Sequence, residues 1–437
     1  MIRQCSTWNQ TTAKRRACFT WNSGSLALLL HRNNMGCRAT IRAPVLSLAR
    51  YSALLSQPSL RSLIAASILG RLPVGITGLS VLLLGQDATG TFGRSGVLAA
   101  CYVAGLATFA PLLGRLIDRQ GPRWLLLVCA FAFPSALAAL VWLLHAGYFS
   151  IALLLAVAAG TCFPPITVCM RTFLRQRLKE ESLLATAYSL ESVLIETIFI
   201  VGPVLVSMFV ALASPSAAVL FAAACGCAGT LLFRRAHALE DWRIEPRKST
   251  SLFGPLAERG FPALLLVVVG YASAFGLVEI ATTAFATETG APSLAGVMLG
   301  VMSIGSAAGG LVYGSRTWRL PLDRQFPLML ILMGAGIAPL ALLPGAWSFG
   351  LWCIPAGIAM APALIMQAML VAKIARAEHA TEAFTWSSTS LLAGVGLGLT
   401  GGGALLEYAR SPAAFAAAAG LSVGAGVLAL RLVKLRN

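Results

Sequence analysis

Charged residues are scarce in this sequence: they make up 11% of 437 residues, whereas hydrophobic residues make up 57%. Soluble domains are roughly one-quarter charged and about half apolar, so a soluble fold of this length could not bury so much apolar surface. The sequence also lacks a phosphate-binding loop of the form G-x-x-x-x-G-K-[ST], which argues against an ATP-driven pump in one chain. It has no histidine pair and no cysteine/histidine cluster, so we expect no metal centre.

The apolar residues that are present gather in stretches of about twenty, the length that an α-helix needs to cross a bilayer. A helix satisfies its own backbone hydrogen bonds in lipid, whereas an open sheet does not, so we predict an all-α membrane protein. The predicted spans are 62–84, 95–115, 123–144, 149–173, 184–209, 215–233, 261–284, 294–314, 326–344, 348–372, 384–406 and 412–431.

Basic residues between these stretches indicate the topology. Alternate connections hold almost all of them: Arg115, Arg119, Arg123, Arg171, Arg175, Arg177, Lys179, Arg234, Arg235, Arg243, Arg247, Lys248, Arg259, Arg316, Arg319, Arg324, Lys373, Arg376, Arg431, Lys434 and Arg436. The opposite connections hold only Arg94 and Arg410. By the positive-inside rule the basic set is cytoplasmic, which places both termini in the cytoplasm and requires an even number of spans. The net charge of +17 therefore indicates anionic lipid headgroups as partners, and no nucleic acid.

A polar connection at 235–260 divides the spans into six and six, so we predict bundles at 62–234 and 261–437 joined by a central cytoplasmic loop. The halves resemble each other weakly. Three glycines of the second span, Gly96, Gly105 and Gly114, recur in the eighth span as Gly296, Gly305 and Gly314. Repeated halves are typical of transporters that bind their solute at the interface near the bilayer midplane.

Residues 1–61 form a basic segment without acidic residues, and we expect it to be disordered. Two explanations for this composition remain. The segment resembles an organelle transit peptide, which would place the protein in an organelle membrane. The other explanation, which we favour, is that translation starts at Met35 and that the protein lies in the cell inner (plasma) membrane.

The connection after the second span reads Gly114-Arg115-Leu116-Ile117-Asp118-Arg119-Gln120-Gly121-Pro122-Arg123. Gly121 permits a tight turn, and Asp118 can cap a helix or accept hydrogen bonds from arginine. This segment resembles the signature loop of the major facilitator superfamily, usually G-x-L-x-D-R-x-G-R-R, with Pro122 in place of a basic residue. The resemblance covers about 62–434 and implies the twelve-span type of that family.

The resemblance implies two six-helix bundles that rock about a central cavity, with the Asp118 loop holding the cytoplasmic side closed. Arg171 at the end of the fourth span is then a candidate partner for Asp118. Glu382 at the start of the eleventh span is a candidate partner for Arg115 or Arg119. The alternative is that these are ordinary helix-end and positive-inside charges.

Four ionisable residues fall well within predicted spans: Arg71, Glu191, Glu196 and Glu279. Burying each in lipid costs a few kcal/mol, so each suggests a functional role. The family fold makes the first and fifth spans neighbours, and we expect Arg71 to pair with one of the two glutamates of the fifth span. The unpaired glutamate could carry a proton. A purely structural ion pair is the alternative.

Glu279 lies in the seventh span, where it could contact solute, carry a second proton, or bond to a neighbouring helix. Prolines indicate two bends. One is at Pro164 and Pro165 in the fourth span, and the other is at Gly202-Pro203, which partly resembles an antiporter motif or is a plain kink.

These features predict a secondary active transporter of a small organic solute, driven by a proton gradient and exporting by alternating access. An uptake symporter for a sugar, organic acid or amino acid is the first alternative, and a non-transporting sensor or a membrane enzyme is the second. We expect a monomer in the lipid bilayer, without enzymatic activity or a cofactor. No local motif identifies the solute.

Overall fold

The computed structural model describes residues 48–56, 58–236, 239–240, 242–244, 254–291, 294–342 and 345–432. These residues belong to one compact unit, Leu46–Asn437. Within the described ranges the chain forms α-helices and short 3-10 helices and contains no strand. The predicted all-α class is therefore confirmed.

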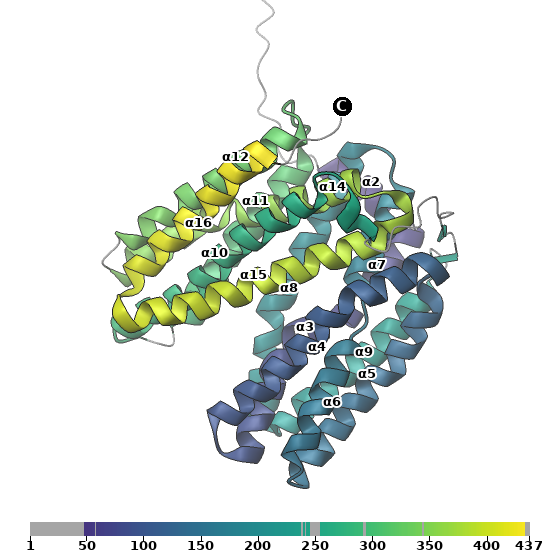
Figure 1. Cartoon of the computed structure of the whole chain (residues 1–437), viewed down its shortest axis with the longest axis vertical. Coiled ribbons are helices and arrows are strands. Elements are labelled where there is room, and N and C mark those ends of the chain that lie inside the picture. Colours follow the sequence, from purple (N-terminus) through teal and green to yellow (C-terminus); the bar gives the residue numbers. More distant parts are fainter. Residues whose placement is uncertain are drawn as a thin grey trace, which may run out of the picture. The chain divides into compact units, whose positions relative to one another are not determined.

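The first half of this unit is a bundle of six membrane-length spans, coloured purple to teal in Figure 1 and called the N-bundle below. Its helices are α3 (Pro58–Thr89), α4 (Phe92–Gln120), α5 (Pro122–His145), α6 (Phe149–Thr161), α7 (Ile166–Arg177), α8 (Glu181–Leu212) and α9 (Pro215–Arg235). The fourth span is interrupted where the sequence predicted a bend, because α6 ends before the Pro164-Pro165 pair and α7 begins after it.

The second half is a matching bundle of six spans, coloured green to yellow in Figure 1 and called the C-bundle. A 3-10 turn, η2 (Gly254–Ala257), precedes it. Its helices are α10 (Phe261–Glu288), α11 (Leu294–Ser315), α12 (Leu322–Ile337), η3 (Ala338–Ala341), α13 (Ala346–Gly357), α14 (Met360–Ile374), η4 (Ala377–His379), α15 (Ala380–Tyr408) and α16 (Ser411–Leu432). The tenth span is broken between α13 and α14, which the sequence did not predict.

Twelve helices in the described residues are long and apolar enough to cross a membrane, as predicted. Their ends differ from the predicted ends by a few residues, mostly because polar helical turns extend beyond the apolar stretch. At Gly202-Pro203 the helix is not interrupted, because α8 continues through Pro203 to Leu212, and a kink there stays a prediction. Gly202 instead lets α8 approach α3, since a Cβ there would lie 2.5 Å from the carbonyl oxygen of Gly75.

The repeated glycines have equivalent surroundings in the two bundles. A Cβ at Gly105 in α4 would lie 2.2 Å from the carbonyl oxygen of Val157 in α6. A Cβ at Gly305 in α11 would lie 2.2 Å from the carbonyl oxygen of Ile354 in α13. Both glycines therefore let two helices of one bundle pack with their backbones in contact, as is common in lipid. The weak sequence repeat thus corresponds to a repeat of packing.

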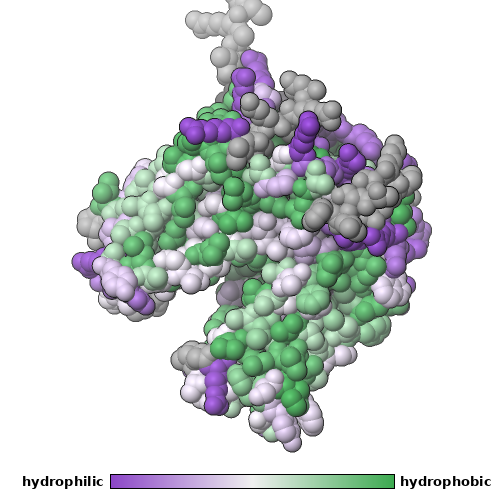
Figure 2. All heavy atoms as spheres, in the orientation of Figure 1, coloured by the Kyte–Doolittle hydropathy of each residue, from purple (hydrophilic) through white to green (hydrophobic). Residues whose placement is uncertain are grey.

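The two bundles meet mainly along two helix pairs, α4 with α15 and α8 with α11, and α7 and α8 also contact α14. The hydrogen bonds between them lie toward the end where α4 ends and α15 begins, which we call the closed end. Beyond these contacts α8 exposes Phe199, Val204 and Leu212, at 54%, 64% and 80% of their surface. Figure 2 shows the molecule hollowed between the bundles on that side, which we call the open end.

A short helix, α2 (Leu48–Leu55), precedes the first span. The expectation of disorder up to residue 61 is therefore wrong for residues 48–56 and 58–61, while residues 1–47 lie outside the described ranges. Tyr51 and Leu54 are buried, so their contacts account for the order of α2. Its eight residues are too few for apolar spacing to indicate a helix.

Candidate functional site

Two side chains of the signature loop, Asp118 and Arg115, form hydrogen bonds with α15 of the opposite bundle at the closed end. The carboxylate of Asp118, at the end of α4, accepts hydrogen bonds from the backbone N–H groups of Thr381 (2.9 Å) and Glu382 (2.8 Å). These N–H groups belong to the first turn of α15, which has no internal acceptors for them. Arg115 in turn donates to both carboxylate oxygens of Glu382, from Nη2 at 2.9 Å and from Nε at 3.1 Å. Loop and helix are thus joined by four bonds between the bundles.

The other residues of the loop have local roles. Gly121 has a φ of +80°, a left-handed conformation that lets α4 end and α5 begin with one residue between them. Arg123 pairs with Glu240 at 3.1 Å, and both side chains are about half exposed. Arg119 is exposed. Of the two predicted partners of Glu382, the structure therefore selects Arg115.

The prediction that Arg171 pairs with Asp118 is wrong. Arg171 donates from Nε to Glu191 at 3.1 Å, within the N-bundle. The physical reason is the break before α7, which sets the rotation of this short helix independently of α6. Asp118 has its acceptors filled by backbone donors of α15 instead.

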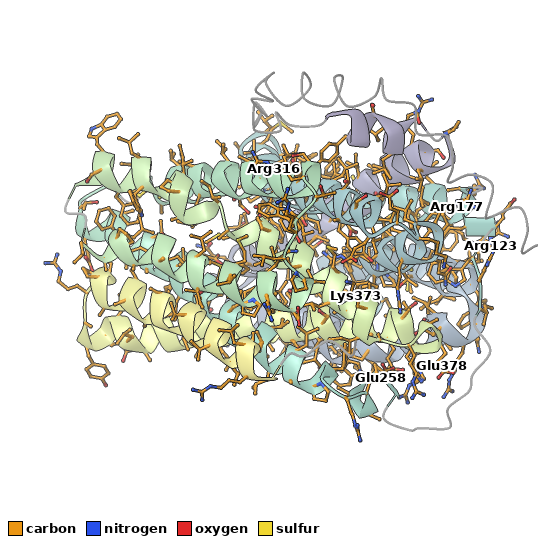
Figure 3. The ribbon with its side chains drawn as sticks, turned by 90° about the horizontal axis from the view of Figure 1, so that it is seen from above. Arg123, Arg177, Glu258, Arg316, Lys373 and Glu378 are labelled. Atoms are coloured by element: carbon orange, nitrogen blue, oxygen red, sulfur yellow. The ribbon has the colours of Figure 1, made fainter. Side chains whose placement is uncertain are left out.

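Further contacts between the bundles surround the loop. Arg175 in α7 donates to the carbonyl oxygen of Ala375 beyond α14, and Lys373 pairs with Glu181 at 2.6 Å. Figure 3 views this region from above and labels Lys373 together with Arg123, Arg177 and Arg316. Basic residues of alternate connections thus gather at the closed end.

Small polar side chains join α8 to α11. Thr186 donates to the carbonyl oxygen of Gly314 at 2.7 Å, and Ser189 donates to that of Gly310 at 2.6 Å. Tyr51 of α2 also contacts both helices, because its hydroxyl lies 2.9 Å from the Ser189 hydroxyl and donates to the carbonyl oxygen of Leu311 at 3.1 Å. The α2 helix therefore bridges the bundles at the closed end.

Glu196 is half-buried on α8, between Ser189 and the exposed Phe199. Its carboxylate accepts a hydrogen bond of 2.8 Å from the hydroxyl of Ser306 in α11. The Ser306 hydroxyl itself accepts from the backbone N–H of Ala361 at 3.0 Å, so its proton is directed at Glu196. One half-buried carboxylate thus forms part of the interface between the bundles.

Glu279 lies on α10, the first helix of the C-bundle, and its side chain is exposed. Tyr271, Phe275 and Glu279 follow one another at intervals of four residues and so form one stripe along the helix. Tyr271 donates to Gln367 of α14 and stacks edge-on against Phe275. Among the described residues Glu279 accepts no side-chain hydrogen bond, which distinguishes it from Glu196.

Of the two glutamates predicted as partners of Arg71, Glu191 forms the ion pair, with 2.7 Å between Nη2 of Arg71 and Oε1 of Glu191. The two side chains are 2% and 3% exposed. Arg171 holds the second oxygen of Glu191, so one glutamate faces two arginines. Glu196, five residues further along α8, belongs to the interface instead, in agreement with the predicted division between the two glutamates.

Sequence reasoning missed the neutral members of this arrangement. Ser306, Thr186, Ser189 and Tyr51 carry no charge, and small polar residues are too common in membrane helices to stand out. The backbone donors of Thr381 and Glu382 could have been inferred, because a helix start predicted near residue 384 leaves free N–H groups beside a candidate Asp118 partner. In the described part of the chain, no group of three His, Cys, Asp or Glu side chains could hold a metal ion.

The model of the Major Facilitator Superfamily matches residues 63–284 of this chain. No curated protein matches the sequence. The matched residues include the signature loop and the Arg71, Glu191 and Glu196 side chains.

Solved structures share the fold. The human organic anion transporter MFSD10 (TETRAN) has a TM-score of 0.67 and 18% identity, covering 85% of this chain and 99% of that chain. A bacterial homologue of the iron transporter ferroportin, in an outward-facing state, has a TM-score of 0.69 and 14% identity, covering 85% and 98%. The proton:xylose symporter XylE has a TM-score of 0.65 and 13% identity, covering 88% and 97%.

Proposed function

Because this chain belongs to the major facilitator superfamily, a family of membrane transporters, we propose that it exports a small organic solute in exchange for protons. The bundles would rock about their interface, so that the hollow opens to one side of the membrane at a time. The observation that carries the proton coupling is the Glu196–Ser306 hydrogen bond, which joins a titratable group to the moving interface.

The charge of Glu196 controls the strength of that bond. A hydrogen bond to an ionised carboxylate is roughly twice as strong as one between neutral groups. Because the Ser306 hydroxyl is committed as a donor, protonation of Glu196 weakens the link between α8 and α11. Proton uptake from the open side therefore favours opening of the closed end, and deprotonation favours its closure. Glu279, exposed on α10, is available to contact the solute.

We assign the closed end to the cytoplasm, because the basic connections gather there. The same assignment puts both termini in the cytoplasm and makes this conformation outward-facing, the state of the ferroportin homologue that shares the fold. We also propose that the protein works as a monomer in the cell inner membrane.

Vesicles with an imposed pH gradient test the direction of coupling. Purified protein would be reconstituted and a panel of radiolabelled organic solutes supplied on the inside, with the outside acidic and a protonophore as the uncoupled control. Export predicts that at least one solute leaves against its gradient while protons enter. Gradient-independent movement of every solute would contradict the proposal.

Glu196→Gln separates coupling from transport itself. Glutamine keeps an acceptor oxygen for Ser306 but cannot titrate, so we expect at least a tenfold loss of gradient-driven export, with solute-for-solute exchange retained. Glu407→Gln, which removes an exposed carboxylate at the end of α15, is the matched control and should leave both activities unchanged. Equal export by wild type and Glu196→Gln would remove Glu196 from the mechanism.

Proton-coupled uptake is the second candidate, because one of the solved structures that share the fold is a proton:xylose symporter. The same vesicles distinguish the two. Protons and solute moving in the same direction would support uptake, whereas movement in opposite directions supports export.

A further inference from the structure

The buried Arg71–Glu191–Arg171 cluster has an excess of positive charge and of hydrogen-bond donors. Two guanidinium groups face one carboxylate, which leaves one net positive charge. Arg71 uses Nη2 for Glu191, but its Nε and Nη1 have no hydrogen-bond partner among the described residues. Unpartnered buried donors cost about 1–3 kcal/mol each and more when they are charged, so an arginine in this state calls for an additional acceptor.

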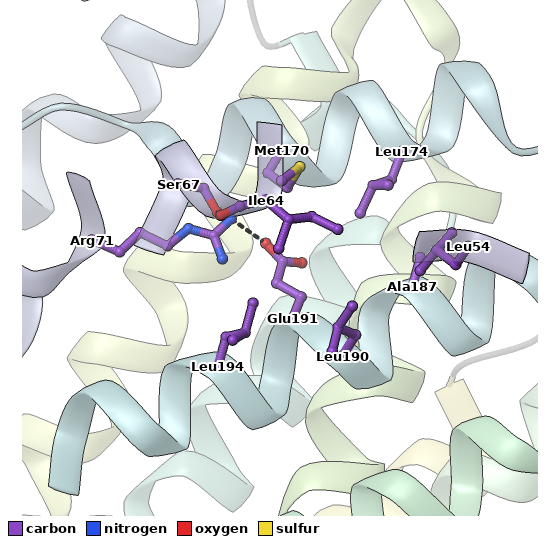
Figure 4. A pocket seen from close by; sticks show the side chains of 10 residues that line it. All are labelled: Leu54, Ile64, Ser67, Arg71, Met170, Leu174, Ala187, Leu190, Glu191 and Leu194. Atoms are coloured by element: carbon purple, nitrogen blue, oxygen red, sulfur yellow. Dashed lines mark hydrogen bonds and ion pairs between the residues drawn. The ribbon is translucent and has the colours of Figure 1, made fainter. Parts of the chain in front are cut away.

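A small pocket adjoins the cluster, between α3, α7 and α8 (Figure 4). Arg71, Ser67 and Glu191 supply its polar lining, and Met170, Leu194 and Leu54 contribute apolar walls. In Figure 4 the guanidinium group of Arg71 points toward the pocket, where the dashed line joins it to Glu191. Its space accommodates about one water-sized particle.

The helices of the C-bundle that correspond to α3, α7 and α8 carry a different set of polar residues at this position. On its first helix Tyr271 donates to Gln367 of α14, and Gln367 donates to Ser387 of α15 at 2.6 Å. These helices correspond to α3, α7 and α8, which carry Arg71, Arg171 and Glu191. The C-bundle network is neutral, and its polar groups bond to one another. The charged version in the N-bundle is therefore not imposed by the fold.

We propose that this pocket binds a small inorganic anion of the size of chloride, held by Arg71 with Arg171 beside it. A water molecule would satisfy a donor but would leave the net charge in a medium where an isolated charge costs several kcal/mol. An anion satisfies the free donors of Arg71 and brings the cluster to neutrality. Leu54 of α2 lines the same pocket, so the bridging helix covers the site.

Thermal unfolding of the full-length protein in detergent tests this site. Chloride would be titrated against gluconate at constant ionic strength, because gluconate is too large for the pocket. We expect a saturable rise in Tm of about 2–4 °C with chloride. The absence of a saturable rise, or an equal rise in gluconate alone, would overturn the proposal.

Substitutions within the cluster test whether chloride binds there, because they should shift the chloride concentration at half-saturation in opposite directions. Arg71→Gln should abolish the chloride-dependent rise, and Arg71→Lys, with fewer donors, should need at least tenfold more chloride. Glu191→Gln raises the net positive charge of the cluster, so the chloride concentration at half-saturation should be at least tenfold lower than in wild type. Arg94→Gln, an exposed arginine outside the site, should behave as wild type.

If Arg71→Gln does not fold, Arg71→Lys and Glu191→Gln still decide the question. An unchanged chloride midpoint in both of these would place any bound ion elsewhere and overturn the assignment. Opposite shifts in the two would support it, because general salt effects on stability do not depend on the sign of a buried charge.

Discussion

One carboxylate, that of Asp118, holds two backbone N–H groups of the opposite bundle. Both donors belong to the first turn of α15, where a negative charge also meets the positive end of the helix dipole. A side chain with two acceptor oxygens and no donor is required at this position. Asparagine has the same shape but can accept with only one of its two terminal atoms.

Asp118→Asn should therefore weaken the closed end without disturbing either bundle. The loss of one hydrogen bond to a charged group is worth about 1.5–3 kcal/mol, so the ratio of closed to open molecules should fall at least tenfold. Spin labels on the exposed residues Gln120 and Arg319 report this ratio as a shift toward longer distances.

Arg119→Gln is the matched control for this substitution, because Arg119 is an exposed neighbour in the same loop. It should leave the distance distribution unchanged. If Asp118→Asn gives the wild-type distribution, the carboxylate does not hold the closed end.

At the scale of helices, glycine packing within the bundles and hydrogen bonds between them can be tested separately. Within a bundle, glycines bring backbones together, as Gly105 does for α4 and α6 and Gly305 does for α11 and α13. Between bundles, side chains such as Asp118, Ser189 and Glu196 make hydrogen bonds that can break and re-form. The proposed rocking requires the contacts within each bundle to persist while the hydrogen bonds between the bundles break and re-form.

Gly105→Ala and Gly305→Ala should each destabilise the protein, because a Cβ 2.2 Å from a carbonyl oxygen forces two helices apart. Overpacking of this kind costs about 1–3 kcal/mol. The measurement is Tm in detergent, which should fall by several degrees for either variant.

Gly96→Ala and Gly296→Ala provide the matched controls, since a Cβ at either position meets nothing within 4 Å. These two changes should leave Tm unchanged or raise it slightly, because alanine favours helix by about 1 kcal/mol over glycine. Equal losses of stability at all four positions would show that backbone contact is not the cause.

At the scale of the whole molecule, the assignment of the closed end to the cytoplasm can be tested directly. Tyr148 and Arg319 are exposed in connections at opposite ends of the molecule. A membrane-impermeant maleimide applied to intact cells should label Tyr148→Cys but not Arg319→Cys. The unmodified chain, which has ten cysteines of its own, supplies the background.

Permeabilised cells are the control, and both variants should then be labelled. Labelling of Arg319→Cys alone in intact cells would invert the topology. It would also make the observed conformation open to the cytoplasm.

The sequence predicts what depends on length and position along a helix. The twelve spans follow from apolar stretches of membrane length. A pair between Arg71 and one glutamate of the fifth span follows from their similar depths together with the family fold, but the choice of Glu191 over Glu196 comes from the structure alone. Rotation about a helix axis is not encoded locally, so the partner of Arg171 was predicted incorrectly. Ser306 and Tyr51 could not be predicted, because the role of a neutral polar residue depends on the hydrogen-bond partners that the fold brings close to it.

The contrast between a charged cluster in the N-bundle and a neutral network in the C-bundle also determines how membrane voltage acts on the protein. A full elementary charge that crosses the whole field gains about 2.3 kcal/mol per 100 mV. Rocking that carries the net charge near Arg71 through a tenth of the field would therefore couple to voltage by about 0.2 kcal/mol per 100 mV. The Tyr271–Gln367–Ser387 network carries no charge through the field. Voltage thus acts at these two places on one half of the molecule only, and a bound anion would cancel its effect.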